Sequence, residues 1–260
     1  VRLEDIAEVH LGVMTGANDF FYLQVMSIDQ KRDVAICVNR AGYEVEIETR
    51  FLKPFIKAPG DLKGICLPES IIQHYLFTCN CEKSELKGTL AGKYISWGES
   101  AEVPIRQGAL KGQTVRGYNH LAFFKAKPHW WVVGTPTECP IVVVKGVNIM
   151  HKVALAPFPV LFDQRFYGLL AKDATEKELT VLLVSAVHLL SRELQGRVNL
   201  GAGALDIGTR DLRGTLVLST RSLTPSQRQG LEKAFDQMAK RDIKSIFEEL
   251  GLPKPNKDYS

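Results

Sequence analysis

The stretch from Thr175 to Leu218 constrains the fold of this 260-residue chain more than any other. It opens with a capping box, in which the Thr175 hydroxyl and the Glu178 carboxylate satisfy the free N–H groups at a helix start. Apolar residues then recur at three- and four-residue spacing, namely Leu179, Leu182, Leu183, Ala186, Val187, Leu190 and Leu194. This spacing predicts one continuous helix, roughly 30 Å long, whose apolar stripe is buried in a core.

The exit from that helix is rich in glycine. Residues 196–204 read Gly-Arg-Val-Asn-Leu-Gly-Ala-Gly-Ala, and they precede two strand-like segments, 205–207 and 216–218. A Gly-x-Gly that follows a helix and precedes a strand has the reverse order of a dinucleotide-binding loop. Two interpretations stay open. One is a turn at which the backbone approaches a phosphate or another chain, beside Arg197 and Asn199; the other is a helix C-cap followed by a flexible connection.

Strand patterns dominate the first two thirds of the chain and helix patterns the last third. Apolar and β-branched runs predict strands at 20–23, 34–38, 43–47, 51–56, 74–79, 141–147, 152–156 and 160–170. A second capping box, from Thr224 to Gln227, starts a helical C-terminal part. The expected fold is α+β, with strand-rich N-terminal two thirds packed on the long buried helix. We expect one domain at 1–222 and a helical extension at 223–260.

Composition excludes several classes of protein. Apolar residues make up 45% of the chain, enough for a buried core in one large domain or two small ones. No apolar run reaches the length of a membrane span, and the first residues resemble no signal peptide. Five cysteines argue against a disulfide framework and predict a reducing, cytoplasmic setting. Buried thiols are favoured over a zinc site because paired Cys-x-x-Cys spacing is missing among Cys66, His74, Cys79 and Cys81.

The clearest functional signal is a window without acidic residues, from Val103 to Thr137. Its cations are interleaved with aromatic side chains: Arg106, Lys111, Arg116, Lys125 and Lys127 with Tyr118, Phe123, Phe124, Trp130 and Trp131. This mixture is typical of nucleic-acid binding, where cations hold phosphates and aromatic or amide groups contact bases. A solvated strand edge is the alternative, because lysine also discourages edge pairing. The adjacent tryptophans would point to opposite faces of a strand, one of them into the core.

Several segments, in this order, resemble a known family. They are Gly12–Phe21, Phe51–Phe55, the tryptophan pair after Lys125 and Lys127, Asp163–Gly168, and the helix with its glycine-rich exit over Leu182–Leu212. Together they are similar to the C-terminal target-recognition domain of adenine-specific DNA methyltransferases of restriction–modification systems. More loosely, they resemble the recognition domains of type I specificity subunits. The resemblance spans roughly Val1 to Leu218 and implies that a catalytic domain binds S-adenosylmethionine and the flipped adenine while the recognition domain reads the DNA.

The chain also departs from a complete enzyme of that family. The family's catalytic tetrapeptide, Asn/Asp/Ser-Pro-Pro-Tyr/Phe, has no counterpart because no two prolines are adjacent, and the strand-first glycine loop for the methyl donor is missing. The sequence begins close to the Thr15–Gly16 motif, as if a preceding domain were absent. We therefore expect no methyl transfer, no catalytic residue, no metal and no cofactor in this chain. S-adenosylmethionine is expected in a catalytic domain that acts in cis or in trans.

The resemblance and the basic window together predict a double-stranded DNA recognition domain with no membrane partner. The residues expected to hold phosphates are Arg106, Lys111, Arg116, Lys125, Lys127 and Lys145. Asparagine pairs with adenine and arginine with guanine through two hydrogen bonds, so the candidate base contacts are Asn119, Asn148, Arg116 and Arg165. Turns expected to face DNA or the catalytic domain carry Thr15, Gly16, Asn18, Arg197 and Asn199. For each of these, turn stabilisation is the alternative.

Two other functions stay open. In the first, the helices beginning near Thr175 and Thr224 dock a separate methyltransferase or nuclease chain, and exposed apolar residues on them would favour this function. In the second, the chain is an enzyme with an unrecognised site, such as a nuclease. A nuclease needs clustered carboxylates for metal ions, and the basic window contains none.

Overall fold

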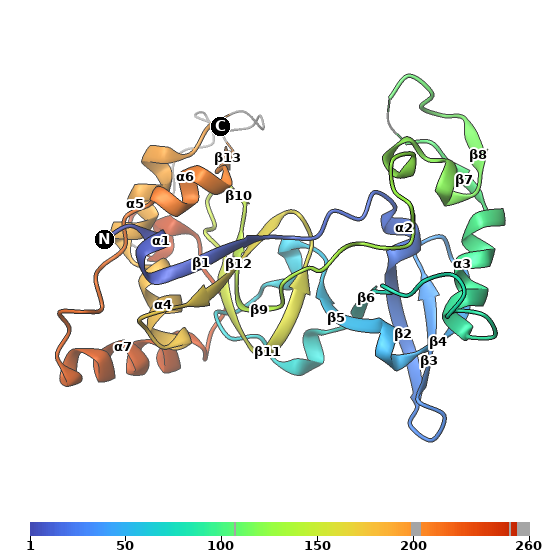
Figure 1. Ribbon diagram of the computed structural model, residues 1–260. Coiled ribbons are helices and arrows are strands. Elements are labelled where there is room, and N and C mark those ends of the chain that lie inside the picture. Colours follow the sequence, from blue (N-terminus) through green and yellow to red (C-terminus); the bar gives the residue numbers. More distant parts are fainter. Residues whose placement is uncertain (107, 199–203, 250, 254–260) are drawn as a thin grey trace. The chain divides into compact units, whose positions relative to one another are not determined.

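The computed structural model describes residues 1–106, 108–198, 204–249 and 251–253. The chain divides into two compact units, and each is described by itself. Unit 1 comprises Val1–Gly12, Lys57–Ile71 and Thr137–Ser260, and unit 2 comprises Val13–Ile56 and Ile72–Pro136. Both units combine helices with antiparallel strands, so the predicted α+β class is confirmed (Figure 1). The division expected at residue 222 stays a prediction.

Unit 1 is built on a sheet with the strand order β1-β12-β9-β11. Its strands are β1 (Ala7–Leu11), β9 (Cys139–Val144), β11 (Val153–Phe162) and β12 (Phe166–Ala171). The β-branched run of β9 forms the buried interior of this sheet, as its composition predicts. A separate short ladder pairs β10 (Gly146–Val147) with β13 (Leu205–Asp206). The strand expected at 216–218 is reduced to an isolated bridge between Arg2 and Leu216.

The helices of unit 1 are α1 (Leu3–Ile6), α4 (Glu176–Leu183), α5 (Ala186–Gln195), α6 (Thr209–Gly214), α7 (Pro225–Met238) and α8 (Ile246–Glu249), with the 3-10 turns η2 (Pro59–Asp61) and η3 (Glu69–Ile71). Leu179 and Leu183 of α4 share one core with the sheet residues Ile141 and Tyr167, and α7 extends this core through Phe235. Both predicted capping boxes are confirmed at the starts of α4 and α7.

The single long helix expected from Thr175 to Gly196 is wrong in one respect, because the chain forms two helices. The Ser185 hydroxyl donates to Leu182 O at 2.6 Å and accepts from His188 N at 3.5 Å. The same hydroxyl therefore ends α4 and caps α5. The apolar spacing continues across this break, but a break changes the direction of the helix axis. For that reason the spacing in α4 does not fix which face of α5 is buried.

Unit 2 contains a second antiparallel sheet, with the strand order β5-β6-β2-β3-β4. Its strands are β2 (Tyr22–Asp29), β3 (Val34–Asn39), β4 (Glu44–Glu48), β5 (Leu52–Ile56) and β6 (His74–Phe77). The predicted hairpin of two strands at 34–38 and 43–47 is confirmed by the pairing of β3 with β4. The strand expected at 20–23 is instead the helix α2 (Asn18–Phe21) leading into β2. A separate hairpin is formed by β7 (Glu102–Pro104) and β8 (Thr114–Arg116).

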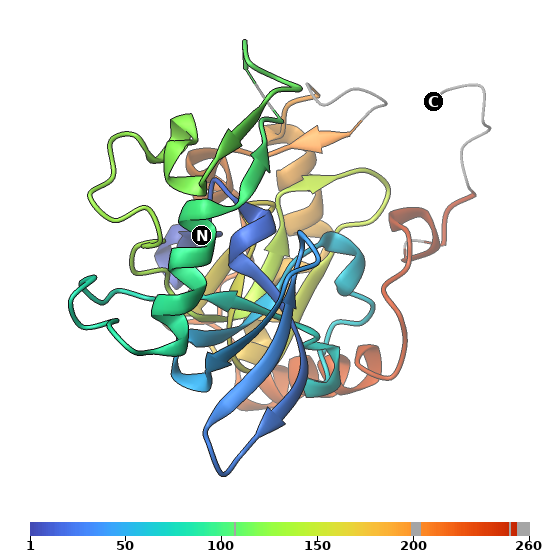
Figure 2. The ribbon, with the colours of Figure 1, turned by 90° about the vertical axis from the view of Figure 1, so that its right-hand side faces the viewer.

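An aromatic core joins the helix α3 (Leu90–Ser100) to the strands of unit 2, beside which α3 lies in Figure 2. The Phe20 and Tyr94 rings stack at 4.3 Å between centroids, and the Tyr94 hydroxyl donates to Phe20 O at 2.7 Å. The Glu48 carboxylate accepts from the backbone N–H groups of Leu90 and Ala91, at 2.8 and 3.0 Å. A carboxylate at this end is favoured by the helix dipole. Helix α3 was missed by the sequence analysis because loop-like residues precede it.

The five cysteines are free thiols. Burial raises the pKa of Cys37 and Cys139 to about 12 and that of Cys79 to about 11, so these three sulfurs are neutral near pH 7. Among the described residues, no group of three or more His, Cys, Asp or Glu side chains is arranged to hold a metal ion. The same part of the chain contains no helix long and apolar enough to span a membrane.

Candidate nucleic-acid interface

The basic window lies in unit 2, in the β7–β8 hairpin, the 3-10 turns η4 (Tyr118–His120) and η5 (Ala122–Phe124), and the loop that follows. The expectation for the tryptophan pair is wrong: neither residue is in a strand and both are buried. The Trp130 ring lies nearly parallel to that of Tyr118, and Trp131 Nε1 donates to Cys81 O at 3.3 Å. The two tryptophans therefore form the aromatic core behind the window and present no stacking surface.

Two basic side chains of the window contact acids from other parts of unit 2. Arg106 Nη2 lies 2.7 Å from Asp19 Oδ2, and His129 Nε2 lies 3.1 Å from Glu82 Oε2. Arg106 thus connects the window to α2. Because Asp19 partly neutralises its charge, Arg106 is a weaker candidate for a phosphate contact. Burial, together with the Asp19 charge, raises the pKa of Tyr118 to about 12, so this phenol is neutral near pH 7.

The charges of the other predicted phosphate contacts in unit 2 are less compensated by acidic side chains. Lys111 and Lys125 are exposed and form no ion pair within the described part of the chain. Arg116 is also exposed and lies opposite Glu102 in the β7–β8 ladder. Lys127 Nζ lies 4.6 Å from the centroid of the Phe123 ring, a cation–π geometry. The window therefore presents cations together with the aromatic side chain of Phe123, which is 40% exposed.

The turn of Thr15, Gly16 and Asn18 meets this surface. Thr15 is buried, and its hydroxyl donates to Asn18 Oδ1 and accepts from Ala17 N at 3.2 Å. Both polar side chains therefore stabilise the turn. Gly16 has φ of +74°, and a Cβ at this position would lie 2.0 Å from the Phe123 ring. The turn and the aromatic residue of the window are thus packed against each other, a contact that no sequence pattern indicated.

Asn119 is half-buried beside the Gly117 backbone. Its Oδ1 atom is buried and accepts no hydrogen bond from the described residues. A Cβ added at Gly117 would lie 2.3 Å from that oxygen, so the amide oxygen packs closely against Gly117. Base contact by Asn119 would need its amide nitrogen to point outward.

The remaining predicted contacts lie in unit 1. Arg165 Nε donates to Asp163 Oδ1 at 2.6 Å and its Nη2 to Lys57 O, so this guanidinium braces a turn. Arg197 pairs with Asp211 at 3.3 Å. Asn148 is exposed and Lys145 is half-buried. Asn199 and the glycines at 201 and 203 lie outside the described residues. The structure thus divides the predicted residues between two units.

No family model and no curated protein matches the sequence. Among solved structures, the chain is similar to the type IIG restriction endonuclease BpuSI, with a TM-score of 0.58 and 11% sequence identity. The match covers 99% of this chain and 28% of the endonuclease chain, so the protein corresponds in length to about a quarter of its structural neighbour. At this level of identity the likeness establishes a shared fold, one present in a type IIG restriction endonuclease.

Proposed function

We propose that the protein is a sequence-specific double-stranded DNA recognition domain of an adenine-specific DNA methyltransferase. The observation that carries this proposal is the basic window of unit 2, in which Lys111 and Lys125 are exposed and the half-buried Lys127 lies over the exposed ring of Phe123. Exposed cations without acidic partners are suited to phosphates, and an exposed aromatic ring is suited to a base or sugar. The fold shared with part of a restriction endonuclease supports the same class of function.

In this proposal, Lys111, Lys125 and Lys127 hold the backbone and fix the register, while side chains such as Arg116 and Asn148 read base edges. Chemistry belongs to a catalytic domain in cis or in trans, which would bind S-adenosylmethionine and the flipped adenine. The resemblance of the ordered segments to target-recognition domains supports the adenine-specific assignment. It is tested by combining the protein with that catalytic domain and identifying the methylated base.

Replacing Lys111 by alanine tests the DNA contact itself. Loss of one phosphate contact should weaken binding to all sequences about equally and lower the slope of log K against log salt by about one unit. Fluorescence anisotropy with 30-base-pair duplexes between 50 and 300 mM KCl measures both quantities. Lys87→Ala is the matched control, because Lys87 is an exposed lysine of unit 2 outside the window. Binding by the unaltered protein that does not change with salt would exclude the proposed contact.

A second candidate function is favoured by one specific observation on α5. This helix buries His188, Leu189, Ser191 and Arg192 and exposes Leu190 and Leu194, of which Leu194 is 78% exposed. Leu216 and Leu218 are exposed on the neighbouring segment, which is tied to α5 by the bond from Leu216 N to Ser191 Oγ. Several exposed leucines on two segments that are bonded to each other are typical of protein interfaces. They are suited to docking the methyltransferase chain on which the first candidate also depends.

A further inference from the structure

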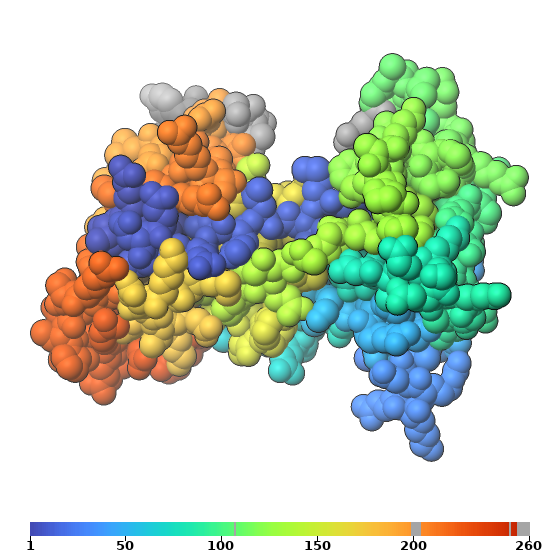
Figure 3. Space-filling model, in the orientation of Figure 1, coloured from blue at the N-terminus to red at the C-terminus, as the bar shows by residue number. Residues whose placement is uncertain are grey.

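A polar hollow in unit 1 contains arginines that the sequence analysis did not select. It has a volume of about 620 Å³ and is lined by Arg2, Glu4, Gln195, Thr209, Arg210, Asp211, Arg213 and Gly214. Backbone and side-chain bonds hold its walls together: Leu3 N donates to Thr215 O at 2.8 Å, and Gln195 Nε2 donates to Gly214 O at 3.2 Å. In Figure 3 the blue N-terminal residues lie against the orange segment that contains α6.

The charges in this hollow leave an excess of cations. Each of its two carboxylates forms an ion pair with an arginine. Glu4 lies 3.5 Å from Arg2, and Asp211 lies 3.3 Å from Arg197, which does not line the hollow. Arg210 is exposed and donates no hydrogen bond to the described residues. Arg213 Nη2 donates to Val9 O at 3.1 Å, and a neutral carbonyl leaves the guanidinium charge uncompensated. Among the residues that the structure describes, Arg210 and Arg213 therefore form no ion pair.

This arrangement is suited to a tetrahedral anion. A guanidinium binds phosphate oxygens through a planar fork of N–H donors, and its charge persists at any physiological pH. The bond to Val9 O restricts Arg213 before a ligand arrives, which lowers the entropy lost on binding. A planar carboxylate is satisfied by one fork, whereas the oxygens of a phosphate accept from several directions. The pair of uncompensated arginines therefore favours phosphate over the acidic side chains of a protein.

We propose that the hollow of Arg2, Arg210 and Arg213 is a second phosphate site, which binds the phosphodiester backbone of duplex DNA. The inference rests on the proposed function, because it assigns the bound phosphates to duplex DNA. It gives unit 1 a DNA contact of its own and gives Arg210 and Arg213 a role in affinity. Since backbone contacts carry no base information, these arginines fix register without changing sequence preference.

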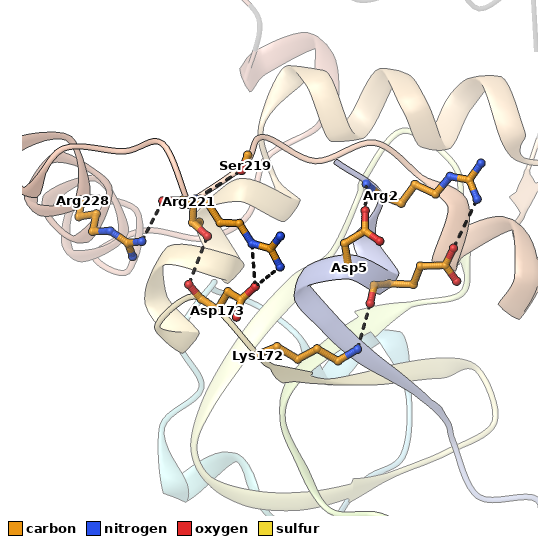
Figure 4. Close-up of polar contacts among 9 residues, drawn as sticks. Arg2, Asp5, Lys172, Asp173, Ser219, Arg221 and Arg228 are labelled. Carbon is orange, nitrogen blue, oxygen red and sulfur yellow. Dashed lines mark hydrogen bonds and ion pairs between the residues drawn. The ribbon is translucent and has the colours of Figure 1, made fainter.

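The test is the double variant Arg210→Ala/Arg213→Ala, with Arg210→Ala alone as a second variant that keeps the Arg213 bond to Val9. The matched control is Arg221→Ala: Arg221 is exposed in the same unit, but its charge is already paired with Asp173 at 2.7 Å (Figure 4). Anisotropy titrations with a 30-base-pair duplex measure affinity and salt slope. We expect about tenfold weaker binding at 50 mM KCl for each arginine removed and a slope lower by about 0.9 for each.

The outcomes separate this inference from the function on which it rests. If the unaltered protein binds duplex DNA and both variants bind like the Arg221→Ala control, the phosphate site is excluded and the proposed function stands. If the unaltered protein binds no duplex, the proposed function fails and the inference fails with it. Two competitors identify other anions. Displacement of the duplex by adenosine monophosphate, or by polyglutamate at equal charge concentration, would assign the hollow to a free nucleotide or an acidic protein and overturn the DNA assignment.

Discussion

Gly16 occupies a position that only glycine fits, for two independent reasons. Its φ of +74° lies in the left-handed region, and its α-carbon faces the ring of Phe123. Thr15 and Asn18 fix the turn around it through their hydroxyl and amide groups. A single small residue therefore positions the exposed aromatic side chain of the candidate interface.

Replacing Gly16 by alanine should destabilise the protein by about 2–4 kcal/mol, because the strained φ and the overlap with Phe123 both contribute. Gly42→Ala is the matched control: Gly42 has φ of +84°, but no atom lies within 4 Å of an added Cβ. The control substitution should lower the free energy of unfolding by only about 1–2 kcal/mol, from backbone strain alone. Urea unfolding of both variants measures the difference, and equal costs would mean that the Phe123 ring moves aside without penalty.

At the scale of the element, α5 is the helix whose predicted apolar stripe is exposed instead of buried. An amphipathic helix in a water-soluble unit usually turns its apolar stripe to the core. Here Arg192 is fully buried and donates to Val144 O at 2.9 Å, while Leu190 and Leu194 face solvent. The apolar spacing of the sequence is present, but the core of unit 1 contacts the opposite side.

Replacing Leu194 by glutamate should leave the free energy of unfolding within about 0.5 kcal/mol, because the side chain is exposed. If α5 docks a methyltransferase chain, as the second candidate function proposes, the same change should abolish co-purification with that chain when the two are co-expressed, since a buried charge opposes docking. Met26→Glu, at an exposed apolar position of unit 2, is the control that should retain the partner. Sedimentation of the protein alone checks for self-association: a dimer lost in Leu194→Glu would assign the surface to a second copy.

At the scale of the whole molecule, the pH dependence of stability comes from two histidines that are buried in unit 1 in their neutral form. His188 is fully buried, and this burial together with the Arg192 charge lowers its pKa to about 3. Burial and Arg192 also lower the pKa of His151, against the opposing effect of Glu193. A histidine with a lowered pKa in the folded state stays neutral there, while the unfolded chain takes up a proton below pH 6.5. Stability is therefore complete above pH 6.5 and falls as the pH falls toward 3.

Between pH 7.5 and pH 5, His188 alone should cost about 2 kcal/mol of unfolding free energy. Urea denaturation at the two pH values measures this loss, and the variant His188→Gln should show a loss smaller by that amount. His120→Gln, at an exposed histidine of unit 2, is the matched control for replacing a histidine by glutamine. A pH dependence that is the same in His188→Gln and in the unaltered protein would show that His188 is not the group responsible.

The sequence by itself determined the α+β class, both capping boxes, the β3–β4 hairpin and the place of the basic window. These features depend on hydrogen bonds and side-chain spacing among residues close in the chain, so a local pattern contains enough information to predict them. The same reasoning selected Lys111 and Lys125 because no acid is near them in sequence, and both are exposed and form no ion pair with the residues that the structure describes.

Only the tertiary structure decided which side chains are exposed and which charges are paired. Both tryptophans are buried, and Asp19 pairs with Arg106. Leu190 and Leu194 of α5 face solvent, and Arg2, Arg210 and Arg213 line one hollow. Burial and charge compensation depend on groups that are distant in the chain, and the spacing of neighbouring residues does not encode those contacts. The break at Ser185 was not predicted for the same kind of reason. The apolar spacing continues across it, but the Ser185 hydroxyl bonds to Leu182 O and caps a second helix.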